Sequence, residues 1–555
     1  MEAYIRSPAF NDRIEAMMRS YHVPGLSLAI VHKGQTTSAG WGQASLDPQN
    51  HARLTRSSCS KSLTAASVAL LVDDDEKYPE VQWDAIMSEL LPDDFVMPGV
   101  GYTENVTLDD VLSHKTGMPR HDFSCLGPLA SQTDTARSIT RNLRNLSVAA
   151  PLRAKFMYNN LMYTVATHLI ESKTQKPFSD FLEENFFVPL GMDSTHLQPS
   201  KSRERGLGDR IGTGHDWDKA NARYLGFQWP DAPEAQGAGL VVSSANDLIK
   251  WVKALLHCEG PIHGRVFQGL VRLRTITELT WRKPKPHTTP AIYAAGLEVH
   301  TYRGQRVISH GGSGFGFSGY FFLLPDLHFG AVMLGNADGA DDIESIVTKE
   351  LIDELLGVPM PERLYLKSFA GKKKEKPPKS TKAKGPRSPP QTQGKPEGLD
   401  RESTKALTVE ASAKAISVSG KEKKKPEDPK EPQSEPQTVP LSAYTGAYWH
   451  PGYRTLIVGI RDEKLFIDAP DRSFGFMITF EHIANNYKFK GHMAFHLSAG
   501  VDSPIDSEFV WEDDQVVRMG LDLEPDMKEL IWFGKKKGGD DVAEIAKRPS
   551  EVGVV

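Results

Sequence analysis

Cysteine and net charge are both scarce in this chain. Three cysteines occur among 555 residues, namely Cys59, Cys125 and Cys258. Three scattered thiols are too few for a disulfide framework or a four-ligand zinc site, and no His-rich cluster indicates another metal. The formal net charge is −5 at pH 7, which gives no general attraction to nucleic acid or anionic lipid. We therefore expect no cofactor, no metal and no nucleic-acid partner.

Long apolar runs are also lacking. The N-terminal residues, Met1–Phe10, contain no basic segment followed by an apolar core, as a secretory signal requires. No other run approaches the length of a membrane span. We therefore expect a soluble cytoplasmic protein without a membrane partner. No Gly-x-Ser-x-Gly turn lies between a strand and a helix, which argues against an α/β-hydrolase.

Composition divides the chain into four parts. Residues 1–365 alternate apolar segments with Gly and Pro turns, and we predict a mixed α/β catalytic domain there. Residues 366–440 are rich in Lys, Pro, Ser, Thr and Glu, which cannot build a core, so we predict a disordered linker. Its Lys runs are typical of a solvated tether, with a nuclear address or a patch for an acidic partner as alternatives. Residues 441–535 predict a small antiparallel β-barrel or sandwich, and 536–555 a flexible tail.

Local patterns in the first part predict particular elements. The β-rich run Leu26–His32 is closed by a Lys33-Gly34 turn and predicts a hairpin. The segment Lys61–Val72, rich in Ala, Leu and Val, predicts a buried helix. Helical spacing also marks Thr164–Glu171 and Asp180–Phe186.

The first chemical motif is Ser58-Cys59-Ser60-Lys61, the one Ser-x-x-Lys in the chain. On a helix, residues three apart share a face, so the Ser58 hydroxyl and the Lys61 amine would meet. A serine needs a base before it is a good nucleophile, and a lysine held neutral by desolvation or by a nearby cation can act as one. Backbone N–H groups at the helix start would help to stabilise an oxyanion.

Two further motifs follow along the chain. Tyr158 and Asn160 form a Tyr-x-Asn that offers a phenol to move protons and an amide to fix Lys61 or bind a carbonyl. His310-Gly311-Gly312-Ser313-Gly314 follows a predicted strand. Small residues there let a substrate approach the backbone, and the N–H of Ser313 is a candidate second oxyanion donor. Taken singly, each motif is also compatible with ordinary packing, a turn or a β-bulge.

The three motifs in this order resemble the serine β-lactamase-like family, which includes class C β-lactamases, penicillin-binding proteins, related esterases, D-aminopeptidases and acyltransferases. The resemblance covers roughly residues 10–360 and implies an α/β (α+β) β-lactamase/transpeptidase-like domain, with a central antiparallel sheet flanked by helices. The segments Tyr444–Tyr448 and His450–Tyr453 resemble the lipocalin-like domains appended to some members. Connecting segments that are also similar to the family are Leu112–Pro119, Phe187–Met192, Gly237–Leu240 and Ser244–Leu248.

The resemblance implies roles for particular residues. Ser58 would be the acylated nucleophile, Lys61 its base or proton partner, and Tyr158 the proton shuttle of deacylation. Asn160 would position groups, while His310 and Gly312 match the strand motif that is His-x-Gly in esterase-like members. Lactamases usually have Lys in place of His310, which carries a charge only when protonated. This departure favours an ester, a simple amide or a D-amino-acyl substrate over penicillin.

Two other segments match known motifs in their letters alone. Lys115-Thr116-Gly117 precedes Tyr158, whereas the strand motif of the family follows the Tyr element. The segment Gly314–Gly319 spells a dinucleotide fingerprint but runs into a predicted strand instead of a helix, so we interpret its Phe315 and Phe317 as pocket walls.

The function predicted from the sequence is a serine hydrolase that acts on a small-molecule acyl substrate through an acyl-enzyme. An acyltransferase that passes the acyl group to a small-molecule acceptor is the first alternative, because only the acceptor differs. The second alternative is a non-catalytic binding protein on the same fold. The oligomeric state is left open.

Overall fold

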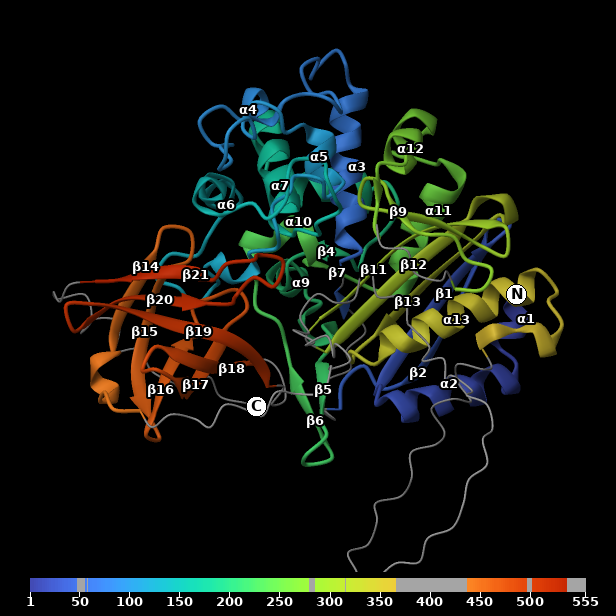
Figure 1. Cartoon of the computed structure of the whole chain (residues 1–555). Coiled ribbons are helices and arrows are strands. Elements are labelled where there is room, and N and C mark those ends of the chain that lie inside the picture. The colour runs from blue at the N-terminus through green and yellow to red at the C-terminus, as the bar shows by residue number, and fades with distance from the viewer. Residues whose placement is uncertain are drawn as a thin grey trace, which may run out of the picture.

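The computed structural model describes residues 1–46, 55–56, 58–278, 285–314, 316–365, 437–496 and 502–536. Phe315, the predicted linker apart from its last four residues, and the predicted tail beyond Lys536 lie outside this set. Figure 1 shows a sheet with helices on both faces and, beside it, a separate C-terminal barrel. Among the described residues, no helix combines the length and the apolar character that crossing a membrane requires.

An eight-stranded antiparallel sheet forms the centre of the first part, in the order β2-β1-β13-β12-β11-β10-β9-β8. The strand β1 shows how the sequence builds it. Leu28 and Ile30 enter the hydrophobic cluster on one face, and Ala29 and Val31 enter the cluster on the other, as expected from a period of two. The strands are β1 Gly25–His32, β2 Gln35–Gly42, β8 Thr275–Ile276, β9 Ile292–Tyr293, β10 Glu298–Tyr302, β11 Gln305–Gly314, β12 Phe317–Leu324 and β13 Phe329–Gly335.

Helices cover both faces of this sheet (Figure 1). On one face, α13 packs on β12 and β13 and against α2, while α11 packs on β13 and β1 from the other face. The helices are α1 Glu2–Ile5, α2 Pro8–Tyr21, α3 Ser60–Asp73, α4 Met87–Leu90, α5 Leu108–Leu112, α6 Ala136–Asn142, α7 Leu161–Thr174, α8 Phe178–Leu182, α9 Pro199–Glu204, α10 Gln236–Gly239, α11 Ala245–His257, α12 Gly264–Val271 and α13 Ala340–Leu355. Short strands lie between them: β3 Thr55–Arg56, β4 His196–Leu197, β5 Gly214–Asp218, β6 Arg223–Phe227 and β7 Val241–Ser243.

The structure confirms the elements predicted from local patterns. The hairpin is β1–β2, with Lys33 and Gly34 at positive φ in its turn. The helix predicted over 61–72 is α3, whose residues are almost all buried, as expected for a helix that is apolar on every side. It packs against α7, α10 and α12 and carries Lys61 in its first turn.

The C-terminal part is a closed barrel of eight antiparallel strands, which decides between the predicted barrel and sandwich. Along β18, buried and more exposed residues alternate, so that Phe489, Met493 and Phe495 fill the interior. The strands are β14 Gly446–His450, β15 Arg454–Arg461, β16 Lys464–Ala469, β17 Phe476–Ala484, β18 Lys488–Phe495, β19 Ser503–Glu512, β20 Gln515–Leu521 and β21 Ile531–Lys535.

The barrel is joined to the first part by backbone contacts. The connection between β16 and β17 lies against residues 125–127. There, Gly127 N–H donates to the carbonyl of Asp471 at 2.9 Å, and Ser473 N–H donates to the carbonyl of Cys125 at 3.1 Å. A Cβ added to Gly127 would lie 2.9 Å from the Ser473 Cα, so glycine permits this close approach.

Candidate active site

Ser58 lies in the turn that leads into α3 and lines a cavity. The N–H of Lys61 donates to the carbonyl of Ser58 at 3.0 Å, so both residues belong to the first turn at the start of the helix. Ser58 is partly exposed, whereas Lys61 is completely buried. The predicted Ser-x-x-Lys spacing is therefore placed where a hydroxyl faces the cavity and an amine lies beneath it.

The Lys61 amine is held by oxygen atoms from two other helices. Its Nζ donates to Oδ1 of Asn160 at 2.9 Å and to the carbonyl of Ala238 at 2.7 Å. Asn160 immediately precedes α7, and Ala238 belongs to α10. The same nitrogen lies 4.9 Å from the centre of the Tyr158 ring. Both acceptors are uncharged oxygens, so they orient the amine without forming an ion pair with it.

Tyr158 lies beside both Ser58 and this amine. Its phenol is hydrogen-bonded to the Ser58 hydroxyl, and burial raises the pKa of Tyr158 to about 12, although the Arg120 charge and that hydrogen bond act in the opposite direction. The phenol therefore keeps its proton at neutral pH. A protonated phenol in this place can donate to a leaving group or to the serine oxygen.

Arg120 and Asp122 also belong to this cluster, and the sequence interpretation missed both. The Asp122 carboxylate accepts a hydrogen bond from Asn160 Nδ2 at 3.1 Å and one from Arg120 Nε at 2.8 Å. The Arg120 guanidinium lies 5.0 Å from the centre of the Tyr158 ring. Their position after Leu112–Pro119, a segment similar to the family, was the available signal.

The strand β11 closes the other side of the cavity. Gly312 lies directly against Ser58: an added Cβ would be 2.4 Å from the Ser58 Cβ and 2.7 Å from its Oγ. Ser313 lines the cavity as well. The structure thus brings Ser58, Gly312 and Ser313 together from segments about 250 residues apart in the chain.

His310 lies deeper along the same strand. It is 1% exposed, and its Nε2 is 3.0 Å from the Tyr293 hydroxyl. Burial and then the charge of Lys61 lower the pKa of His310 to about 3, so the imidazole is neutral at physiological pH. His310 does not line the cavity beside Ser58.

The cavity measures about 80 Å³ and has walls from both parts of the chain. Ser473 and Phe474 come from the barrel, and Ser473 Oγ donates to a carboxylate oxygen of Glu234. The sequence interpretation did not anticipate these barrel residues. The other lining residues are Ser58, Arg120, Asp122, Cys125, Asn160, Leu161, Thr164, Trp229, Ala235, Ala238, Gly239, Leu240, Gly312, Ser313 and Gly314.

Phe317 lies away from this cavity. It is 4% exposed and belongs to the hydrophobic core, because its strand β12 pairs with β11 and β13 inside the sheet. We therefore do not include Phe317 among the walls, and Phe315 is outside the described residues. In the part of the chain that the structure describes, no group of three His, Cys, Asp or Glu side chains has a metal-binding arrangement.

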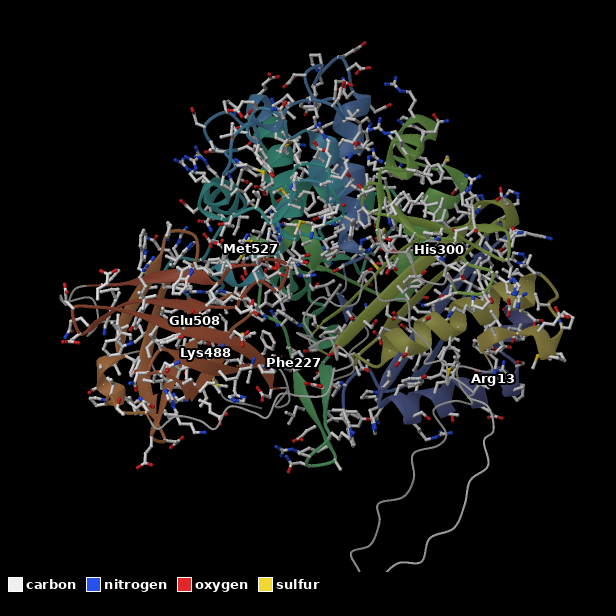
Figure 2. All side chains as sticks on the ribbon, in the orientation of Figure 1. Arg13, Phe227, His300, Lys488, Glu508 and Met527 are labelled. Atoms are coloured by element: carbon white, nitrogen blue, oxygen red, sulfur yellow. The ribbon has the colours of Figure 1, made fainter. Side chains whose placement is uncertain are left out.

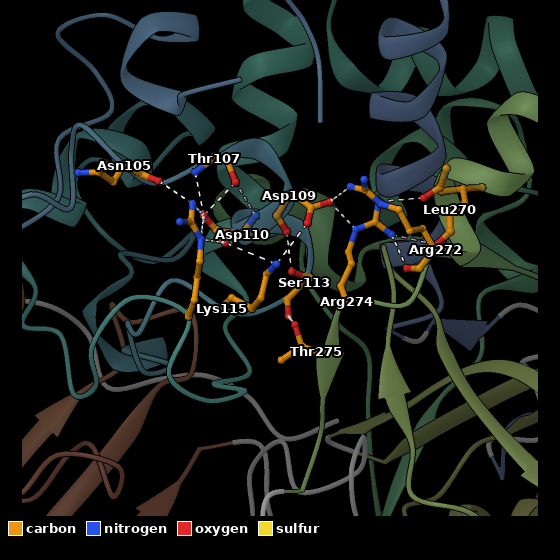
Figure 3. A network of polar contacts seen from close by, with 12 residues as sticks. Asn105, Thr107, Asp109, Asp110, Ser113, Lys115, Leu270, Arg272, Arg274 and Thr275 are labelled. Atoms are coloured by element: carbon orange, nitrogen blue, oxygen red, sulfur yellow. Dashed lines mark hydrogen bonds and ion pairs between the residues drawn. The ribbon is translucent and has the colours of Figure 1, made fainter. Parts of the chain in front are cut away.

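Lys115, the first residue of the literal Lys-Thr-Gly, belongs to a separate ionic network. Figure 3 shows it facing Asp109 and Asp110 of α5, with Arg274 on the other side of Asp109. Its Nζ is 3.2 Å from the Asp109 carboxylate and 3.6 Å from that of Asp110. This network ties α5 to the segment after α12, and the geometry supports the interpretation of this Lys-Thr-Gly as unrelated to the strand motif.

Comparisons with known proteins agree with this geometry. A family model described as Beta-lactamase matches residues 10–351. The chain belongs to the beta-lactamase family. Residues 430–535 match a second family, described as a domain of unknown function (DUF3471).

Two relatives of this family member are similar over nearly their whole length. The unguisins hydrolase of Aspergillus campestris is 29% identical over 94% of this chain and 89% of its own. The unguisins hydrolase of Aspergillus violaceofuscus is 28% identical over 97% of this chain and 92% of its own. Among solved structures, the octameric penicillin-binding protein homologue from Pyrococcus abyssi matches with a TM-score of 0.55 and 16% identity, covering 94% of this chain and 98% of its own. That likeness shows a shared fold that includes both parts of the chain.

Gly312→Ala should lower the rate of Ser58 acylation about 100-fold, because the added methyl group pushes directly on the nucleophile. The overpacked site should also cost about 1–3 kcal/mol of unfolding free energy. Acylation by an activated ester and thermal unfolding measure the two effects. Gly314→Ala is the matched control, because an added Cβ at that position meets nothing within 4 Å. Equal acylation rates for the two variants would contradict the close approach of β11 to Ser58.

His310 should stay uncharged across the working pH range, because a pKa lowered to about 3 places its protonation far below neutrality. The KM for an anionic ester should therefore not improve, relative to a neutral ester, between about pH 8 and pH 5.5. His310→Gln can keep a hydrogen bond to Tyr293 and should show the same profile. A KM that improves at acid pH for the anionic ester alone, and only in the parent chain, would show a charged imidazole at this site.

Proposed function

We propose that this chain is a serine hydrolase that forms an acyl-enzyme at Ser58. The observation that carries the proposal is the position of Tyr158, which is hydrogen-bonded to the Ser58 hydroxyl and has the Lys61 amine 4.9 Å from its ring centre, next to the cavity that Ser58 lines. Membership of the beta-lactamase family and the hydrolase names of the two relatives support the same class of reaction. The clash that a side chain at position 312 would cause explains why this strand carries glycine beside the nucleophile.

In the proposed first step, Ser58 Oγ attacks the acyl carbon and its proton passes to Lys61 in the neutral amine form. Asn160 and Ala238 accept hydrogen bonds from that nitrogen, and the centre of the Tyr158 ring lies 4.9 Å from it. The backbone N–H groups of Ser58 and Ser313 stabilise the oxyanion. Tyr158 donates a proton to the leaving group as the tetrahedral intermediate collapses. Lys61 then returns its proton to Tyr158. In the second step, water attacks the acyl carbon while its proton passes to the neutral Lys61 amine, and Tyr158 donates its proton to Ser58 Oγ as the acyl–oxygen bond breaks.

The proposed substrate is a small ester, amide or D-amino-acyl compound. His310 supplies no positive charge for an anionic group, which disfavours penicillin. The cavity combines apolar walls, such as Trp229 and Phe474, with the polar side chains of Arg120, Asp122 and Glu234, so it suits an acyl group that has both characters. Unguisins, the compounds in the names of the two relatives, are therefore candidate substrates.

Covalent labelling tests this function. A serine-reactive phosphonate should add one phosphonyl group, and peptide mass spectrometry should locate it on Ser58. A panel of esters, amides, D-amino-acyl peptides, unguisins and benzylpenicillin then defines the acyl group, with and without small alcohols or amines as acceptors. Acceptor-dependent product would favour acyl transfer over hydrolysis. Absence of any adduct on Ser58 would overturn the proposal.

A further inference from the structure

Two barrel residues hold His121, which lies between the active-site residues Arg120 and Asp122. Glu524, in the connection between β20 and β21, accepts the backbone N–H of His121 at 2.6 Å. Tyr453, in the turn between β14 and β15, has its hydroxyl 2.7 Å from Nδ1 of His121. The label of Met527 in Figure 2 marks the same connection as Glu524, at the edge of the barrel nearest the helices.

The hydrogen bonds of the His121 ring define its orientation. Its Nε2 lies 2.7 Å from the carbonyl of Ser147, and a carbonyl can only accept, so Nε2 carries the proton. Nδ1 therefore accepts from the Tyr453 hydroxyl. Burial lowers the pKa of His121 to about 4, which agrees with a neutral ring. Its backbone has a φ of 48°, so the residue combines an uncommon conformation with three hydrogen bonds.

Successive residues of this segment face opposite sides. Arg120 and Asp122 point to the cavity, whereas His121 and Phe123 contact the barrel. The Phe123 ring lies 5.4 Å from that of Phe476 and 5.9 Å from that of Phe495, both inside barrel strands. The barrel therefore contacts this segment through His121 and Phe123, while the side chains of Arg120 and Asp122 line the cavity.

The hydrogen bonds continue from this segment to the lysine. Asp122 is 7% exposed and accepts from Asn160 Nδ2, whose Oδ1 in turn accepts from the Lys61 amine at 2.9 Å. On the other side, Arg120 reaches both Asp122 and the Tyr158 ring. A shift of His121 would therefore move groups that touch both Lys61 and Tyr158.

We propose that Glu524 and Tyr453 are positioning residues for the catalytic centre, which act through His121, Asp122 and Asn160 on Lys61. The barrel thus helps to orient the Lys61 amine, in addition to supplying part of the cavity wall. This proposal rests on the proposed function, because it assumes that Lys61 takes the Ser58 proton. Misplacement by about 1 Å can reduce a rate about 100-fold, so the effect on acylation should be large even though neither residue lines the cavity.

The test uses the full chain with Glu524→Leu, Glu524→Gln and Tyr453→Phe. Glutamine keeps an oxygen that can accept the His121 N–H, whereas leucine removes it, and phenylalanine removes the hydroxyl alone. Glu512→Leu and Tyr487→Phe are matched controls, because both residues are exposed on the barrel. Two quantities are measured: the rate of Ser58 acylation by an activated ester, and deuterium uptake in peptides that cover residues 119–126 and 157–163.

We expect Glu524→Leu to lower the acylation rate about 10- to 100-fold and to raise uptake in both peptides. Tyr453→Phe should act in the same direction with a smaller effect, while Glu524→Gln and both controls should stay close to the parent. If Glu524→Leu does not fold, Tyr453→Phe alone decides the result. Unchanged uptake at 157–163, or an unchanged acylation rate in a parent chain that does acylate, would overturn the proposal. If the parent chain is not acylated at all, the proposed function fails, and uptake still decides whether the barrel orders Asp122 and Asn160.

Discussion

Ser58→Ala should lower turnover of any accepted substrate at least about 10⁴-fold and should abolish phosphonate labelling, because no other oxygen replaces the attacking hydroxyl. The fold should be retained, since Ser58 is partly exposed in a turn ahead of the helix core. Steady-state hydrolysis and intact-protein mass spectrometry measure the effect. Any residual rate would reflect binding and the oxyanion donors alone.

Ser60→Ala is the matched control for this substitution. Ser60 is two residues further along, and its Oγ accepts the N–H of Val241 at 3.1 Å, so it faces β7 and does not line the cavity. Labelling should persist in this variant. Labelling that disappears in Ser60→Ala and survives in Ser58→Ala would show that Ser60, and not Ser58, is the nucleophile.

Lys61→Met should slow acylation by about 10³-fold or more, because methionine fills similar space but cannot accept the proton of Ser58. The loss also leaves the buried carbonyl of Ala238 and Oδ1 of Asn160 without their donor. Unfolding free energy should therefore fall by about 1–3 kcal/mol. Rapid mixing with an activated ester gives the acylation rate, and thermal unfolding gives the stability.

Lys115→Met separates a catalytic lysine from a structural one. Lys115 loses its ion pairs with Asp109 and Asp110, so this variant should be less stable but should acylate at nearly the parent rate. Both variants should therefore be less stable than the parent, but only Lys61→Met should acylate slowly. Slow acylation in Lys115→Met with normal acylation in Lys61→Met would reject the proposed role of Lys61.

Local sequence was sufficient to predict elements whose structure depends on residues close together in the chain. Ser58 and Lys61 are three residues apart, and the predicted helix start places both in its first turn. The hairpin β1–β2 and the helix α3 likewise follow from alternation, turn residues and apolar content. The pairing of these residues with Tyr158 came from motif order, and hydrogen bonds and ring contacts of the structure connect these groups.

Long-range contacts could not be predicted in this way. Arg120 and Asp122 look like ordinary loop residues, and only the approach of α7 gives Asp122 its bond to Asn160. Phe317 was interpreted as a pocket wall once the dinucleotide fingerprint was rejected, but it pairs with Gly314 of β11 and is buried in the hydrophobic core. The barrel residues Ser473 and Phe474 reach the cavity because the barrel packs against the first part of the chain and shares one hydrophobic cluster with it. No local sequence pattern records this packing.

The shared wall of the cavity has a consequence for how this protein is made. The contact between Ser473 and Glu234 joins residues 239 positions apart, and that between Glu524 and His121 joins residues 403 positions apart. Such distant contacts form late, because the entropy cost of closing a long loop comes before the contacts that offset it. Ser58 and Lys61 are synthesised well before the barrel strands, because they precede them in the chain. The nascent chain therefore carries Ser58 in an unfinished pocket until the segment with Ser473 and Phe474 has been synthesised and has docked.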